Sequence, residues 1–228
     1  MISITPVYEL PEFQKGMNIG EEIVKNFQLL HNDVVVVTSK VVSKAEGRLV
    51  VAPSRSDFEK HVLSESRRVL RQRGDMMIVE THHGFICANA GIDQSNVPEG
   101  YIALLPKDSD RSARRIRDQI YAKSGVKVGV IVSDTFGRSW RRGVTDVALG
   151  VAGIAAIVDL RGSLDANQRE LKVTEVAIAD EIASAAELVK GKASRVAVVV
   201  VRGVEDSYFR ESTVSSELVR VPIEDLFR

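Results

Sequence analysis

The 228-residue chain is poor in residue types that would point to particular protein classes. Its one cysteine, Cys87, cannot form an internal disulfide, so we expect a reducing, cytoplasmic environment. Aromatic residues make up only 5% of the chain, so Val, Ile, Leu and Ala must form most of the core. This composition favours α/β layering over a β-sandwich.

An excess of one charge and long apolar runs are also lacking. Lys plus Arg equals Asp plus Glu, at 31 each, whereas nucleic-acid-binding proteins usually carry a basic excess that neutralises phosphates. The chain has no run of about 20 apolar residues that would span a membrane. Its first residues do not resemble a secretion signal. We therefore expect partners that are neither nucleic acid nor membrane.

The chain has no repeat or flexible linker, and its length fits one domain over 1–228 or two closely packed lobes. The patterns predict a mixed α/β (α+β) fold, with segment 154–158 either a strand or the end of a buried helix. Strands are predicted at 34–37, 76–79, 85–88, 101–105, 126–132 and 197–201, and helices at 55–73, 111–122 (capped by Asp110), 143–152 and 174–189.

Two acidic segments are candidate metal sites. Asp134 and Thr135 directly follow the buried run at 126–132, and ligands of open α/β sheets gather at strand ends. Asp93 follows Gly91, which permits a close ligand approach. Oxygen ligands of this kind suit Mg²⁺ or Mn²⁺. The alternatives are a cap for the next turn at Asp134 and an Asx turn at Asp93.

Two basic segments are candidate anion sites. Ser39, Lys40 and Lys44 follow the strand at 34–37 and carry donors for phosphate oxygens, or are simply solvated at a strand end. Segment 137–143 places three arginines and Trp140 between two glycines, which suits phosphate or carboxylate groups. There, Trp140 would either stack on a ligand ring or pack beneath the loop.

Other reactive residues have simpler explanations. Gly191 and Lys192 do not form a Walker A motif, because Ala193 follows them, so any nucleotide site must be built in another way. His82 and His83 are adjacent and are expected in a turn between two strands, rather than as metal ligands. Cys87 is expected as a small buried residue rather than a catalytic thiol.

Several segments, taken together and in this order, resemble one family. They are LPEF, TSKVVSKAEGR, AGIDQSN, SDTFGRSWRRG, DLRG and ADEIASAAELV, at 10–13, 38–48, 90–96, 133–143, 159–162 and 179–189. The chain is similar, through PIEDLFR at its end, to the coenzyme F-420:L-glutamate ligases, also called F-420-0 gamma-glutamyl ligases. SDTFGRSWRRG and AGIDQSN are the specific parts of the resemblance.

The resemblance implies a two-lobed fold outside the P-loop class, a homodimer, and no fused reductase domain. It implies an enzyme that uses GTP to join L-glutamate to the lactyl phosphate carboxylate of F-420-0 through an acyl phosphate, with further gamma-linked glutamates as an extension. Two divalent ions, Mg²⁺ or Mn²⁺, are expected, with K⁺ as another candidate ion. The rival hypotheses are an amide ligase acting on another acidic cofactor and a non-catalytic nucleotide-binding regulator.

The resemblance also implies roles for particular residues. No side chain is expected to act as a covalent nucleophile. The loop at Lys190, Gly191 and Lys192 approaches the nucleotide in the family but is more basic here, and many members have a glycine where Gln168 stands. The GTP contacts fall on Leu10, Pro11, Glu12, Phe13, Ser39, Lys40, Lys44 and Asn96, and the metal ligands on Asp93, Asp134 and Thr135.

Overall fold

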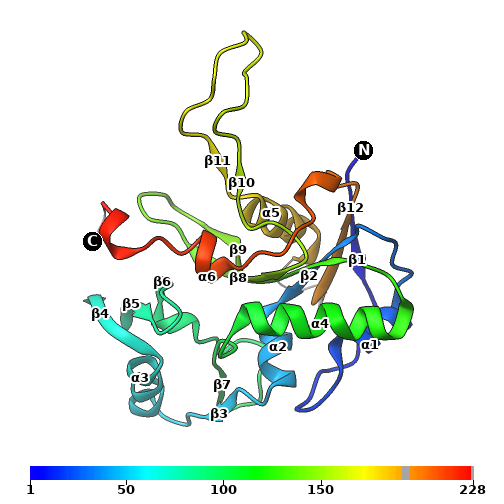
Figure 1. Ribbon diagram of the computed structural model, residues 1–228. Coiled ribbons are helices and arrows are strands. Elements are labelled where there is room, and N and C mark those ends of the chain that lie inside the picture. Colours follow the sequence, from blue (N-terminus) through cyan, green and yellow to red (C-terminus); the bar gives the residue numbers. More distant parts are fainter. Residues whose placement is uncertain (192–195, 227–228) are drawn as a thin grey trace.

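The computed structural model describes residues 1–191 and 196–226, arranged around a central β-sheet (Figure 1). Strands β2 and β8 are parallel, and the other neighbouring pairs in this sheet are antiparallel. Its order across the described residues is β1 (Ser3–Val7), β12 (Val198–Arg202), β2 (Val34–Thr38), β8 (Gly129–Gly137) and β9 (Val144–Ala152). The valine runs of β2 and β12 are buried on both faces, as expected for strands covered by helices on both sides.

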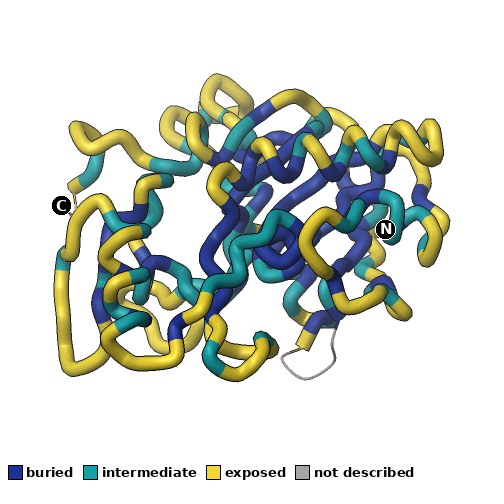
Figure 2. Tube along the Cα trace, turned by 90° about the horizontal axis from the view of Figure 1, so that it is seen from below, coloured by how far each residue is buried: buried dark blue, intermediate teal, exposed yellow. Residues whose placement is uncertain are grey.

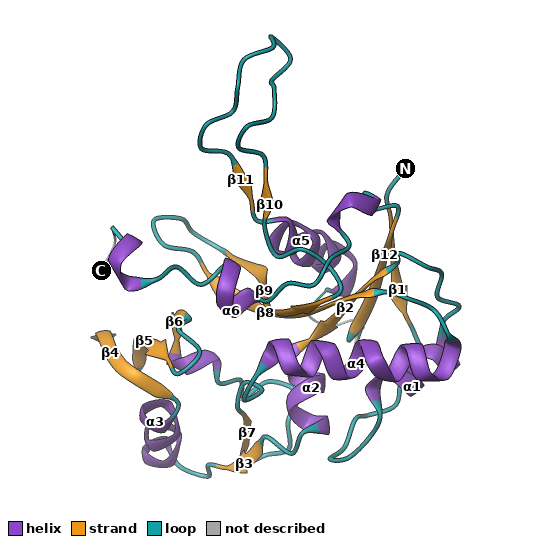
Figure 3. Cartoon of the chain, viewed as in Figure 1, coloured by secondary structure: helices purple, strands orange, loops and turns teal. Residues whose placement is uncertain are grey.

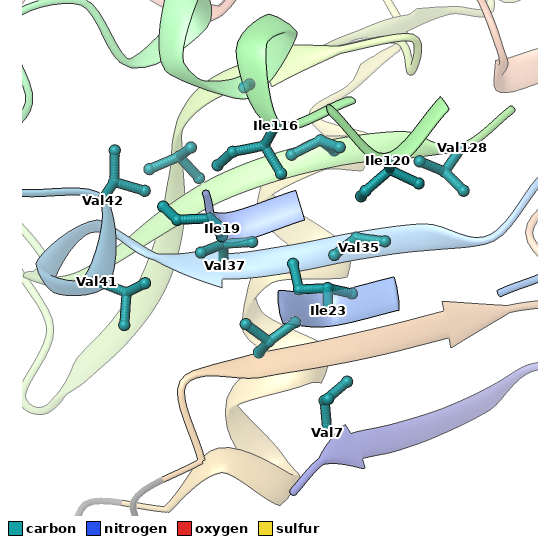
Figure 4. Close-up of a cluster of buried hydrophobic side chains, with 14 of the residues drawn as sticks. Val7, Ile19, Ile23, Val35, Val37, Val41, Val42, Ile116, Ile120 and Val128 are labelled. Atoms are coloured by element: carbon teal, nitrogen blue, oxygen red, sulfur yellow. The ribbon is translucent and has the colours of Figure 1, made fainter. Parts of the chain in front are cut away.

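Helices cover the two faces of this sheet (Figure 3). On one face α1 (Ile19–Asn26) and α4 (Ser109–Ser124) pack against alternate valines of β2, β8 and β12. Figure 4 shows this cluster, with Ile19, Ile23, Ile116 and Ile120 over Val35 and Val37. On the other face α5 (Ile178–Lys190) buries Ala179, Ile182, Ala183 and Ala186 against the intervening strand residues. Figure 2 shows the resulting buried centre and the exposed outer loops.

Helix α4 is fixed by close contacts and by one buried carboxylate. The N–H of Gly20 in α1 donates to Gln119 Oε1 at 3.1 Å, and a Cβ at Gly20 would lie 2.6 Å from Gln119 Cβ. Asp110 was expected to cap this helix, but Asp108 does so by accepting from the Arg111 N–H at 2.8 Å. The Asp110 carboxylate instead accepts N–H groups from β9 and from the C-terminal segment, at Val151, Val214 and Ser215.

A smaller hydrophobic cluster lies away from the central sheet. It packs Phe58 and Val62 of α3 (Arg55–Ser64) against Met77, Val79 and Ile102. The strands here are β3 (Leu49–Val51) paired with β7 (Tyr101–Ala103), and β4 (Ser66–Arg73), β5 (Met76–Thr81) and β6 (Ile86–Ala88) in one sheet. Helix α2 (Ser39–Ala45) lies between this part and the central sheet (Figure 1).

The remaining elements are short. Strands β10 (Val158–Asp159) and β11 (Glu175–Val176) form the base of an arm that projects from the body (Figure 1). Helix α6 (Val214–Glu217) and 3-10 turns at Asn89–Gly91, Asp206–Tyr208 and Pro222–Glu224 complete the described chain. No helix in residues 1–191 and 196–226 combines the length and the apolarity that crossing a membrane requires.

The predicted α/β class is confirmed, and so are the buried strands at 34–37 and 197–201, whereas two of the predicted helices are wrong. The helix predicted over 55–73 ends at Ser64, because residues 66–73 pair with β5 as β4. The segment 143–152 is strand β9, paired with β8 along its length. Segment 154–158 is neither a regular strand nor a helix, apart from Val158 in β10.

Candidate functional site

The end of β2, beside its parallel neighbour β8, brings the first candidate residues together. Thr38 at the end of β2 is in register with Ser133 of β8, and α2 begins at Ser39, the next residue after β2. The Ser39 hydroxyl donates to Asp134 Oδ1 at 3.0 Å. Strand β8 was expected to end before Asp134, but it continues to Gly137, so this carboxylate projects from within the β8–β9 ribbon.

The Asp134 carboxyl has an unusual electrostatic environment. Burial raises its pKa from 3.8 to about 7, the nearby charges of Asp93 and Asp146 add to the rise, and hydrogen bonds from Ser39 and the Thr135 N–H only partly oppose it. Near neutral pH this carboxyl is therefore protonated in part of the molecules, and a bound cation would favour its ionised form.

Asp93 is held beside this carboxyl by backbone pairing and a lysine. Its N–H and C=O pair with Ala103, at 3.0 and 2.8 Å, so β7 positions the loop. Lys40 Nζ lies 2.6 Å from Asp93 Oδ2 and donates to Ser95 Oγ at 2.7 Å. Burial raises the pKa of Asp93, but the hydrogen bonds from Lys40 and Ser95 outweigh it and hold the pKa below its usual value. Asp93 is thus ionised near neutral pH.

The second lysine of α2 joins two of the predicted nucleotide segments. Lys44 is buried, forms an ion pair with Glu12 and donates to the backbone carbonyl of Asn96 at 3.0 Å. Pro11 and Glu12 are exposed and Leu10 is partly exposed, whereas Phe13 is buried in the core, so its side chain anchors the loop rather than facing a ligand. The structure therefore brings segments 10–13, 39–44 and 93–96 together around the two lysines.

A second polar cluster lies on the opposite face of β8, and sequence reasoning missed its centre, Asp146. Successive strand residues point to opposite faces, so Thr135 faces away from Asp134 and lies opposite Asp146 of β9. The Thr135 hydroxyl donates to Asp146 Oδ1 at 2.7 Å, and the Ser133 hydroxyl donates to Asp146 Oδ2 at 3.0 Å. Lys190 Nζ forms a buried ion pair with Asp146 and donates to Ser133 Oγ at 3.0 Å.

The other sequence candidates lie elsewhere. The arginine segment forms the turn of the β8–β9 hairpin, where Trp140 is 91% exposed and does not pack beneath the loop. His82 and His83 occupy the expected turn, with Nε2 atoms near backbone carbonyls at 3.1 and 2.9 Å. Lys192, part of the basic loop named above, is outside the described residues.

Cys87 is buried as expected. Burial raises the pKa of its thiol to about 12, so the thiolate that a nucleophile requires is suppressed.

The donors present are of the type that Mg²⁺ and Mn²⁺ prefer. They are carboxylate and hydroxyl oxygens, and the raised pKa of Asp134 indicates a site that a cation would stabilise. Across residues 1–191 and 196–226, no three His, Cys, Asp or Glu side chains gather as a metal-ligand set. A bound ion would therefore need oxygens from another source, such as phosphates or water. Asp134 and Thr135 face opposite sides of β8, so their oxygens do not point into one common space.

The fold and the site together define an α/β protein without a Walker A motif, in which carboxylates, hydroxyls and lysines meet where β2 ends beside β8. Residues 8–203 match the family described as F-420-0:gamma-glutamyl ligase. This match covers most of the chain, and the chain belongs to that family.

Curated relatives are similar over nearly their full lengths. Coenzyme F-420:L-glutamate ligase of Methanocaldococcus jannaschii is 38% identical, over 96% of this chain and 94% of that protein. The proteins of the same name from Methanopyrus kandleri and Methanothermobacter thermautotrophicus are 39% and 37% identical; each match covers 100% of this chain, with 98% and 99% of the relative.

Proposed function

We propose that this protein joins L-glutamate to the lactyl phosphate side chain of coenzyme F-420-0, with GTP as the phosphoryl donor. Family membership and the names of the relatives support the acceptor and the amino acid. The structural observation that carries the proposal is the meeting of Ser39, Asp134, Lys40 and Asp93 beyond the C-terminal end of β2. The product is an amide, and further gamma-linked glutamates would extend it.

The chemistry requires an activated carboxyl group, because oxide is a poor leaving group. In the proposed reaction an oxygen of the acceptor carboxylate attacks the γ-phosphorus of GTP, and the bond to GDP breaks. The glutamate amine then loses a proton and attacks the acyl carbon. The bond between this carbon and the phosphate oxygen breaks, and phosphate leaves with that oxygen. The protein's task is to position the groups and balance their charge.

The lysines and the loop backbone supply the phosphate contacts in this proposal. An ammonium group has three donors, so Lys40 can keep its bond to Asp93 while donating to a phosphate oxygen. Lys44 lies between Glu12 and the Asn96 carbonyl, where the exposed part of segment 10–13 can contact the nucleotide. No covalent nucleophile is needed, in keeping with the protonated state of Cys87.

Asp93 and Asp134 would hold one divalent cation, and Thr135, on the other face of β8, would contribute to a second. Mg²⁺ or Mn²⁺ bound to these oxygens would neutralise charge on the phosphates. Asp93 and Asp134 keep their side chains near one another through the β7 pairing and the Ser39 hydrogen bond. K⁺ is a further candidate ion.

The test is to mix the purified protein with F-420-0, GTP, L-glutamate and Mn²⁺ and to measure the product mass. A mass increase equal to one glutamate residue, or to several, is expected. Asp134→Asn should lose most of this activity, whereas Asp180→Asn should keep it, because Asp180 binds the β9 backbone at Ala148 instead. No mass change with the wild-type protein, or full activity of Asp134→Asn at limiting metal, would contradict the proposal.

Three finer properties have separate tests. We expect faster turnover with GTP than with ATP at low nucleotide concentration; equal rates would remove the preference but not the ligase activity. We expect a homodimer; a monomer mass in light scattering at micromolar protein would refute it. With oxygen-18 in the acceptor carboxylate, one labelled oxygen should appear in phosphate. The cytoplasmic location stays a prediction.

A further inference from the structure

An open groove of about 730 Å³ lies along α4, beside the start of α1. Both helices cover the same face of the central sheet (Figure 1). The groove is lined by Arg111, Arg114 and Arg115 of α4, and by Asn18 and Glu21 at the start of α1. None of its lining residues belongs to the candidate site described above, so the groove is a separate surface feature.

Two acidic side chains also line this groove, but other cations pair with them. The carboxylate of Asp118 lies 3.2 Å from the guanidinium of Arg117. The carboxylate of Glu21 lies 3.3 Å from Lys25 Nζ and 3.4 Å from Lys123 Nζ. These two carboxylates are therefore already matched by positive charge that is not supplied by the three arginines.

The three arginines have no such partners. Within residues 1–191 and 196–226, the side chains of Arg111, Arg114 and Arg115 form no ion pair and no hydrogen bond. Residues three and four apart on a helix are neighbours, so Arg111 lies beside the other two, and their like charges repel. Arg111 is also in the first turn of α4, where the helix dipole disfavours a positive charge. The free protein thus carries an electrostatic cost that a bound anion would remove.

The groove also offers the hydrogen-bond donors that an anion needs. A guanidinium group presents five N–H donors in a planar fork, which matches two oxygens of a phosphate or carboxylate group. Gln119 Oε1 accepts the Gly20 N–H at 3.1 Å, which fixes this amide and leaves its NH₂ group as a further donor. Three forks within five consecutive helix residues suit a ligand with several anionic groups better than one with a single charge.

We propose that this groove is a second anion site, which binds a small molecule with several phosphate or carboxylate groups. It is distinct from the nucleotide site proposed above, which is built around Lys40 and Lys44. The balance of acidic and basic residues over the whole chain argues against a nucleic acid as the occupant. Because the arginines are at the surface, binding weakens as the ionic strength rises.

The test is isothermal titration calorimetry in metal-free buffer of low ionic strength, with tripolyphosphate and a peptide of γ-linked glutamates as probes. At least one probe should bind the wild-type protein. Arg111→Gln with Arg115→Gln should weaken that binding by about ten-fold or more, because charge-assisted hydrogen bonds are lost. This variant should fold, since neither side chain forms an ion pair within the described part of the chain.

Two further variants serve as controls. Arg71→Gln with Arg73→Gln removes the same charge from exposed side chains of β4 and should leave the affinity unchanged. Lys40→Gln weakens the proposed nucleotide site and should keep the binding in the groove.

The outcomes decide both the inference and the class of ligand. Binding of the peptide alone would assign the groove to a carboxylate chain, and binding of tripolyphosphate alone to a phosphate chain; binding of both supports the shared chemistry. If neither probe binds, or if the α4 variant binds as tightly as the β4 control, the inference is wrong. Loss of binding in Lys40→Gln but not in the α4 variant would also overturn it, because the probe would then occupy the nucleotide site. The ligase assay is independent of these measurements, so a failure of either proposal is seen separately.

Discussion

The ionisation of Asp134 predicts a pH-dependent stability that one substitution removes. In metal-free protein the folded state keeps the Asp134 proton up to about pH 7, whereas an unfolded aspartate releases it near pH 3.8. The stability that this proton contributes is therefore complete below pH 3.8 and is lost as the pH rises to about 7. Asp134→Asn cannot ionise, and its amide oxygen can still accept the Ser39 hydroxyl.

The magnitude follows from the pKa. Between about pH 5 and about pH 7 the loss is about 1.4 kcal/mol per pH unit, or about 3 kcal/mol for a fully enclosed carboxyl. Asp134 is partly exposed, so solvent screening reduces this to about 1.5 kcal/mol. The free energy of unfolding of wild-type protein should thus fall by about 1.5 kcal/mol relative to Asp134→Asn between about pH 5 and about pH 8.

Urea unfolding of chelator-treated protein at the two pH values measures this difference. Asp159→Asn is the control: the hydrogen bonds from Arg161 hold the pKa of Asp159 at about 2, so it is ionised at both pH values and should give no pH-dependent difference. Adding Mn²⁺ should restore the wild-type stability at the higher pH, because a cation stabilises the ionised carboxylate. A constant difference between wild type and Asp134→Asn would show that this carboxylate is adequately solvated or paired, and would refute the reasoning.

Two further substitutions and one labelling experiment test the packing and the backbone. Gly20→Ala should reduce the free energy of unfolding by about 1–3 kcal/mol in urea, because its Cβ would lie 2.6 Å from Gln119 Cβ; Gly137→Ala, with open space around it, should be neutral. Gln168 has φ +62°, the left-handed region that favours glycine, so Gln168→Gly should leave stability unchanged or raise it by up to about 1 kcal/mol, and a clear loss would contradict this. Iodoacetamide should label Cys87 in unfolded but not in native protein, since burial raises the pKa of its thiol to about 12.

Two of the strands that the sequence predicts correctly are runs in which almost every residue is buried. Val34–Val37 and 197–201 are uninterrupted β-branched and small apolar runs, which are typical of strands covered on both faces. Residues 66–73 and 143–152 were assigned to helices because their local propensities do not exclude a helix. Their pairing with β5 and β8, a contact between distant residues, makes them strands.

In the candidate site, too, some residues can be predicted from the sequence, whereas Asp146 depends on a contact between distant residues. Ser39, Lys40, Asp93 and Asp134 stand in recognisable motifs, and the structure brings them together. Asp146 was missed because its segment was taken as a helix, in which it has no relation to Thr135. The available signal was the pair of glycines, Gly137 and Gly143, bracketing a turn between two apolar segments, which is a hairpin pattern. A hairpin would have placed Asp146 opposite the segment around Thr135.

The order of strands in the central sheet has a consequence for how the chain folds during synthesis. Within the described residues, the partner of β1 is β12, so β1 must wait until the last strand of this sheet has been made. Until then one edge of the valine-rich β2 is unpaired and can associate with other chains. Such distant pairings form slowly, because a long loop must close first. Folding of this sheet can therefore be completed only after β12 has been made, and until then the unpaired edge of β2 is open to aggregation.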